Sequence, residues 1–173
     1  SDNSVIAAFA GSASRLKYVK DCLIDMQSRI NTVVNGWNSG YRDTFVSSTG
    51  SQIGSSLGLL LNQLDFEIDL LKNGKIGIPL GKKSLDVILP EKCEAYYAKT
   101  ISVQLARECL TNLENVYRGR SRAGADGLGL DDYLSSLGAM HGTTSLDEAI
   151  KNQFSIARQK LTALSEPLTA ELV

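Results

Sequence analysis

Apolar residues recur along this chain at alternating steps of three and four, and this spacing restricts the fold more than any other feature of the sequence. Such a repeat places apolar side chains on one face of an α-helix, where they form a continuous stripe. The first stripe consists of Leu16, Val19, Leu23, Met26, Ile30, Val33 and Trp37. The pattern predicts amphipathic helices that bury these stripes against one another.

Three further stripes have the same spacing and lie within residues 45–71, 97–116 and 146–168. A short helix is also expected over residues 131–137, before the last stripe. Four long helices joined by short or moderate connections favour antiparallel packing. The sequence therefore predicts an all-α fold, an up-down four-helix bundle that forms a single domain over residues 1–173.

Glycine, proline and serine mark the expected helix boundaries. Asn73 and Gly74 predict the end of the second helix, and Pro90 fits the first position of the third. Ser145 and Glu148 have the spacing of a capping box at the start of the last helix. Between the second and third helices, the sequence GKIGIPLGKKSLDVILPE predicts a long Pro/Gly loop, in which KIGIPL could form a short extended piece.

The expected second helix contains glycines four residues apart, at Gly50, Gly54 and Gly58. Each glycine costs about 1 kcal/mol in a helix relative to alanine, so the row needs a compensating role. A row of small residues lets another backbone approach closely. Two interpretations follow: tight packing inside the bundle, or a docking face for another domain.

The charge balance excludes several general partners. Eighteen basic and nineteen acidic residues give a net charge of −1, which provides no general attraction to nucleic acid. No apolar run approaches the roughly 18 residues of a membrane span, so no transmembrane segment is expected. Cys22, Cys93 and Cys109 are too few and too scattered for a disulfide framework, and we expect free thiols.

The sequence contains no complete catalytic or metal-binding motif. His141 is the single histidine, and no carboxylate lies near it before Asp147. A transition-metal site takes three or four converging ligands, and neither Glu-x-x-His nor zinc-type cysteine spacing is present. We therefore expect no catalytic residue, no metal ligand and no cofactor in this chain alone.

Three segments carry a family resemblance. They read NQLDFEIDLLKNGKIGIPLG, then EKCEAYYAKTISVQLARECLTNLENVYRG, then GLDDYLSSLG followed by SLDEAIKNQFSIARQKLTALSEPL. In this order they resemble the C-terminal half of imelysin-like proteins, and together they cover most of residues 16–172. The family's GxHxxE motif is absent, because Gly138, Met140 and His141 do not reproduce it. The chain also has Ala98 where the family often has serine.

The resemblance implies one half of a bacterial protein built from two helical bundles. It implies a secreted protein that is periplasmic or attached to the outer membrane, for example as a lipoprotein at the cell surface, and that functions in iron uptake. The implied partner is the N-terminal bundle that bears GxHxxE, and iron is possible in the complete protein. The positions expected to form the interdomain or ligand-binding face are Glu67, Lys75, Pro79, Glu94 and Tyr97.

Three functions remain open at this point. The chain could be the non-catalytic half of an imelysin-like iron-uptake protein, with a ligand- or partner-binding junction between two bundles. It could be a fragment of a metallopeptidase whose metal residues lie on the other half. From a different class, it could be a plain helical protein-interaction module without a small-molecule site.

Overall fold

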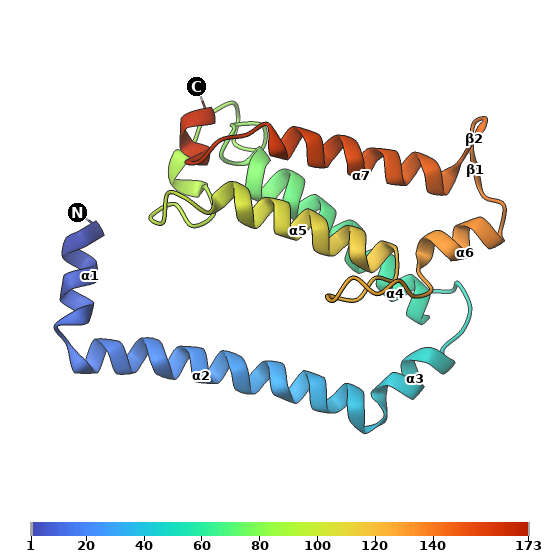
Figure 1. The fold of residues 1–173 in the computed structure, drawn as a ribbon, viewed down its shortest axis with the longest axis horizontal. Coiled ribbons are helices and arrows are strands. Elements are labelled where there is room, and N and C mark those ends of the chain that lie inside the picture. The colour runs from blue at the N-terminus through green and yellow to red at the C-terminus, as the bar shows by residue number, and fades with distance from the viewer. Residues whose placement is uncertain (1, 173) are drawn as a thin grey trace. The chain divides into compact units, whose positions relative to one another are not determined.

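The computed structural model describes residues 2–172, and it is mostly helical (Figure 1). This confirms the prediction of an all-α fold. The elements in chain order are α1 (Asp2–Ala10), α2 (Ala13–Gly36), the π-helix η1 (Trp37–Tyr41), α3 (Arg42–Ser47), α4 (Ser56–Asp69), the π-helix η2 (Leu70–Gly77), the 3₁₀ turn η3 (Pro90–Lys92), α5 (Ser102–Tyr117), α6 (Leu130–Ser136), β1 (Met140–His141), β2 (Thr144–Ser145), α7 (Leu146–Thr162) and the 3₁₀ turn η4 (Leu168–Glu171).

The chain forms two compact units, Ser1–Leu61 and Asn62–Val173, and each is described by itself. The second unit begins inside α4. The prediction that residues 1–173 form a single domain, itself one half of a two-bundle protein, stays a prediction.

In the sequence, Gly36 and Gly40 interrupt the first apolar stripe and predict the end of its helix, and the long helix α2 of the first unit ends there. Gly36 is its last residue, and Gly40 has a φ of 124°, a backbone conformation that side chains with a Cβ rarely adopt. Three aromatic rings pack across this kink: the Trp37 ring centroid lies 5.0 Å from that of Tyr41 and 5.2 Å from that of Phe45. These contacts link α2 to α3.

The expected second helix is interrupted, which corrects one prediction. Residues 48–55 are not helical, and Gly50 and Gly54 have φ values of 114° and 88°. These glycines therefore form a turn and do not provide a row for close helix packing. The helix restarts at α4, where the buried Ser55 hydroxyl accepts a hydrogen bond from the Gly58 amide at 3.2 Å. Such a serine cap satisfies a free amide at a helix start, and this favours the break.

The expected third helix also starts later than predicted. Pro90 begins only the short turn η3, and α5 starts at Ser102. Ala95 and Lys99 have positive φ values of 52° and 59°, which are incompatible with a right-handed helix. Before this segment, η2 continues past the predicted stop at Asn73 and Gly74, so KIGIPL is helical or turn-like and not extended.

The later boundaries agree better with the sequence. Helix α6 occupies the place of the expected short helix, and α7 starts directly after Ser145. Ser145 makes no side-chain capping hydrogen bond, so the expected capping box does not form. Ser145 lies in β2, where it pairs with Met140 across a two-stranded antiparallel sheet.

The core of the second unit is built around α5, which packs against α7, α6 and η2. Figure 1 shows α5 and α7 lying side by side. The buried face of α5 consists of Val103, Ala106, Leu110, Leu113 and Tyr117. The predicted stripe shares only Leu110 and Leu113 with this face; its members are Tyr97, Ile101, Leu105, Cys109, Leu110, Leu113 and Val116. Val116, for example, is 46% exposed. The neighbouring elements also bury apolar side chains: Leu64 from α4, Leu71 from η2, and Phe154 and Leu161 from α7.

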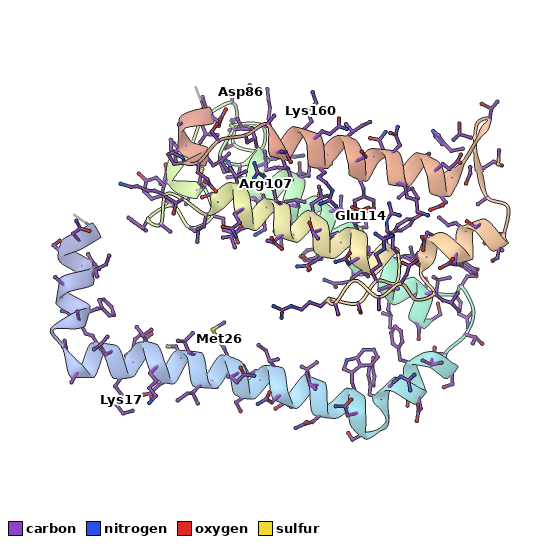
Figure 2. All side chains as sticks on the ribbon, in the orientation of Figure 1. Lys17, Met26, Asp86, Arg107, Glu114 and Lys160 are labelled. Atoms are coloured by element: carbon purple, nitrogen blue, oxygen red, sulfur yellow. The ribbon has the colours of Figure 1, made fainter. Side chains whose placement is uncertain are left out.

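Polar contacts hold both ends of α5. At its N-terminus, the Glu166 carboxylate accepts hydrogen bonds from the amides of Val103 at 2.7 Å and Gln104 at 3.1 Å. These amides have no partner within the helix, and a carboxylate is favourable at a helix N-terminus. One turn further, the Arg107 guanidinium donates to the carbonyl oxygen of Leu161 at 3.1 Å, and so covers the end of α7 (Figure 2). The two helices are therefore aligned antiparallel.

At the other end of α5, a charged network joins α5, α6 and α7. The Lys151 ammonium lies 2.8 Å from the Asp147 carboxylate and 3.0 Å from that of Asp131. The Tyr117 hydroxyl donates a hydrogen bond to Asp147 at 2.9 Å. Burial and this bond to a carboxylate raise the pKa of Tyr117 well above its usual range. The network satisfies the charges that packing of the three helices would otherwise leave buried.

We predict that Leu161→Ala lowers the free energy of unfolding by about 2–5 kcal/mol, because it leaves a cavity in the core between α5 and α7. Leu128→Ala is the matched control: Leu128 is 92% exposed, and the change should be within about 0.5 kcal/mol of the original chain. Urea unfolding followed by circular dichroism measures both. Equal stability of the two variants would contradict the assigned core.

We also predict that acidification below about pH 4 destabilises the fold through Asp131 and Glu114. Burial opposes ionisation of Asp131, yet the hydrogen bond and charge of Lys151 hold its pKa below the ordinary 3.8. Burial likewise opposes ionisation of Glu114, but Arg158 and Arg118 hold its pKa below the ordinary 4.5. A lowered folded-state pKa contributes stability above the unfolded value, and this contribution is lost as the pH falls through the folded value.

Chemical unfolding between pH 7 and pH 2 tests this. The double variant Asp131→Asn/Glu114→Gln should lose less stability on acidification than the original chain. An Asp65→Asn variant is the control, because Asp65 is exposed and its replacement should leave the slope unchanged. If the original chain, the double variant and the Asp65→Asn variant show the same acid dependence, Asp131 and Glu114 are not the source of the acid sensitivity.

Candidate functional site

Two of the predicted face residues form an ion pair. The Lys75 ammonium in η2 lies 2.5 Å from the Glu94 Oε2 atom, which follows the turn η3. Their side chains are 22% and 36% exposed, so the pair is half-buried and partly shielded from water. A cation and an anion nineteen positions apart in sequence are thus placed in contact by the loop between them.

The backbone around Glu94 is anchored to the start of α5. The buried Ser102 hydroxyl donates a hydrogen bond to the Glu94 carbonyl oxygen. The Glu94 Oε2 atom is itself buried. Apart from its ion pair with Lys75, it accepts no hydrogen bond in the described part of the chain. Its charge is balanced by the Lys75 ammonium alone. Buried polar atoms are normally hydrogen-bonded, so this atom has unused acceptor capacity.

Glu67 and Cys109 complete a cluster with this pair. Glu67 lies half-buried on α4, and its carboxylate accepts a hydrogen bond from the side-chain amide of Gln63 at 2.9 Å. Burial raises the pKa of the Cys109 thiol on α5; the Lys75 charge opposes this, and the Glu67 and Glu94 charges add to it. We call Glu67, Lys75, Glu94 and Cys109 the ionic cluster. Its three charged members were predicted as face residues, but Cys109 was not. Nothing in the spacing of residues along the chain indicates that Cys109 lies near the other three.

The other two predicted face residues lie differently. Pro79 is fully buried, and its carbonyl oxygen accepts a hydrogen bond from the Leu89 amide at 3.0 Å. It thus closes the loop between η2 and η3 from inside. Tyr97 is 77% exposed in the turn before α5, with its ring edge-on to that of Tyr96 at 5.1 Å. Within the described residues, neither forms a hydrogen bond or ion pair with the ionic cluster. Their part in the expected face stays a prediction.

The described residues offer no ligand set for iron. His141 is exposed in β1, and within residues 2–172 no three histidine, cysteine, aspartate or glutamate side chains are grouped so that they could hold a metal ion. The predictions that this chain alone binds no metal and carries no catalytic residue stay predictions. Separately, no helix within residues 2–172 is both long and apolar enough to cross a membrane.

The three cysteines are free thiols, as expected: Cys22 is exposed, Cys93 is buried and Cys109 is half-buried. Burial raises the pKa of Cys93, and the negative charges of Glu166 and Glu91 add to this effect. The three thiols therefore differ in environment, which makes them distinguishable by chemical reactivity.

A second feature of this unit was not predicted from the sequence. An open groove of about 1060 Å³ lies along α7 and is bordered by η2, α5 and the β1–β2 hairpin. Its lining is mostly apolar. The lining residues are Ile68, Leu71, Lys72, Ile76, Leu110, His141, Thr144, Leu146, Glu148, Ala149, Ile150, Asn152, Gln153, Phe154, Ala157, Lys160 and Leu161. None of these residues belongs to the ionic cluster.

These features define a helical protein with a half-buried ionic cluster at one site and an apolar groove at another. A family model described as Imelysin, Peptidase_M75, matches residues 2–172, nearly the whole chain, and the protein therefore belongs to the imelysin family. The family resemblance inferred from the three sequence segments is confirmed. Comparison with curated proteins and comparison with solved structures each gave no match.

The ionic cluster predicts how the Cys109 thiol reacts. Lys75→Met should slow its alkylation at pH 8, because loss of the nearby cation raises the thiol pKa further. Glu67→Gln should accelerate it, because loss of a nearby anion lowers the thiol pKa. Iodoacetamide labelling followed by peptide mass spectrometry gives the rate at each cysteine.

The exposed Cys22 serves as the internal reference in each protein, because its environment lies outside the ionic cluster. Its labelling rate should not change in either variant. If both substitutions change the Cys109 rate in the same direction, a general loosening of the fold explains the data better than the charges do.

Proposed function

We propose that this chain is the non-catalytic half of a two-bundle imelysin-family protein that functions in iron uptake, and that the ionic cluster meets the second bundle. The observation that carries this proposal is the half-buried ion pair between Lys75 and Glu94, with Glu67 beside it. Periplasmic or outer-membrane attachment belongs to the same proposal and rests on the family resemblance.

The charge of the cluster favours a cationic partner. The cluster contains two carboxylates, those of Glu67 and Glu94, and one ammonium group, which pairs with Glu94, so it carries an uncompensated negative charge. Glu94 Oε2 also has unused capacity to accept a hydrogen bond. A partner side chain that donates a charge-assisted hydrogen bond would satisfy both requirements. Lys75, Glu67 and Cys109 lie on η2, α4 and α5, and the Glu94 backbone is anchored by Ser102, so little ordering would be needed on binding.

Iron would be held by the partner bundle in this proposal. The absence of a ligand set within residues 2–172 leaves this half to contribute the wall of the junction. The carboxylates of Glu67 and Glu94 would act on ligands of the other bundle by charge and hydrogen bonding, as outer residues do around metal sites. No step of metal chemistry is assigned to residues of this chain.

A second candidate follows from the peptidase description of the family model. In that case the complete protein would be a metallopeptidase, and this chain would again provide the wall of the junction. A peptidase assay on the two bundles together, with and without a chelator, separates the candidates. Chelator-sensitive cleavage would favour the peptidase, and iron binding without cleavage would favour the uptake protein.

Binding between the two halves tests the junction directly. This chain would be titrated calorimetrically with a GxHxxE-bearing N-terminal imelysin bundle from the same protein. Glu67→Gln should weaken binding about tenfold, equivalent to about 1.4 kcal/mol, by removing a charge from the junction. Asp65→Asn is the matched control, since Asp65 is exposed on the same helix and outside the cluster.

Equal weakening by both substitutions would indicate a general electrostatic effect and would contradict the assigned face. No binding by the original chain would instead favour the plain interaction module with a different partner.

A further inference from the structure

We infer that the groove along α7 binds a long-chain fatty acid, with its acyl chain on the apolar lining and its carboxylate at Lys72 and Lys160. The inference does not depend on the proposed function, because the groove and the ionic cluster share no residue. It stands on the shape of the groove, on its lining and on the position of its charges.

The shape and lining of the groove suit an elongated apolar ligand. Its lining extends along α7 from Leu146 to Leu161, a helical rise of roughly 22 Å at 1.5 Å per residue. Its volume of about 1060 Å³ lies just above the roughly 300–1,000 Å³ found for small-molecule sites. Ile150, Phe154 and Ala157 recur at steps of four and three, and they lie on the face of α7 that lines the groove. Phe154 is already buried, and an acyl chain would cover the half-buried Ile150 and Ala157 and remove their remaining apolar surface from water.

The charges of the lining select an anionic end group. Lys160 lies in the last turn of α7, and Lys72 lies in η2 beside the buried Leu71. Neither lysine forms an ion pair with another residue in the described chain. The single lining carboxylate, Glu148, lies in the first turn of α7, at the opposite end of that helix from Lys160.

This distribution gives the groove a direction. A carboxylate at the Lys72 and Lys160 end would be attracted by two unpaired ammonium groups and would lie away from Glu148. The acyl chain would then extend over Ala157, Phe154 and Ile150 toward the β1–β2 hairpin. An uncharged ligand of the same length would gain the apolar contacts but not the ionic ones.

Titration of the full 173-residue chain with palmitate and with hexadecanol, each below its aggregation concentration, tests this inference. Palmitate should bind with one-to-one stoichiometry and more tightly than the uncharged alcohol. The double variant Lys72→Ala/Lys160→Ala should weaken palmitate binding at least about tenfold and leave hexadecanol binding unchanged. The matched control is Lys82→Ala/Lys92→Ala, which removes two exposed lysines that do not line the groove.

Ala157→Trp provides a second, independent variant, because a large side chain at this half-buried position would fill the groove. It should abolish binding of both ligands, with circular dichroism and thermal unfolding used to confirm the fold. If Ala157→Trp does not fold, the lysine variants decide alone. No saturable palmitate binding by the original chain, or equal weakening by the two lysine pairs, would overturn the inference.

Discussion

The second unit depends on burial of one face of α5. Val103, Leu110, Leu113 and Tyr117 lie on that face, and α7, η2 and α6 pack against the helix. The hydrophobic effect supplies the driving force but does not by itself set the alignment of the helices. Directional contacts at the two ends of α5 set it. Glu166 binds the free amides at one end, and Tyr117 binds Asp147 at the other.

Charged side chains in this unit occur as compensated groups around that core. Lys151 lies between two carboxylates, and Glu114 is paired with both Arg118 and Arg158. Removal of one member of such a group leaves the other partly buried and unpaired, which is why each group acts as a unit. The ionic cluster differs, because Lys75 pairs with Glu94 while Glu67 adds a negative charge that forms no ion pair in the described chain. That unpaired carboxylate is the feature on which the proposed junction rests.

The candidate site could be predicted only in part. Lys75 and Glu94 were selected from a family resemblance, and the structure brings them into contact. Cys109 and the groove could not be found in this way, because both depend on which helix faces meet. The stripe predicted for α5 was rotated relative to the buried face, and an error of one position on a helix moves a side chain by 100°, enough to exchange buried and half-exposed residues. The groove is lined by residues of α4, η2, α5, α7 and the β1–β2 hairpin, which are distant in sequence, so no local pattern predicts it.

The sequence by itself determined the helical character of this protein and many of its helix ends. Periodicity of 3.6 residues and the special backbone of glycine are local properties, and they correctly placed the end of α2 at Gly36 and the start of α7 after Ser145. Tertiary structure decided where the second and third helices break, which face of α5 is buried and which charges meet. A cap at Ser55 or an ion pair between Lys75 and Glu94 stabilises one geometry among several that the local pattern allows. The choice among them depends on contacts between residues far apart in the chain, and these exist only once the helices have packed.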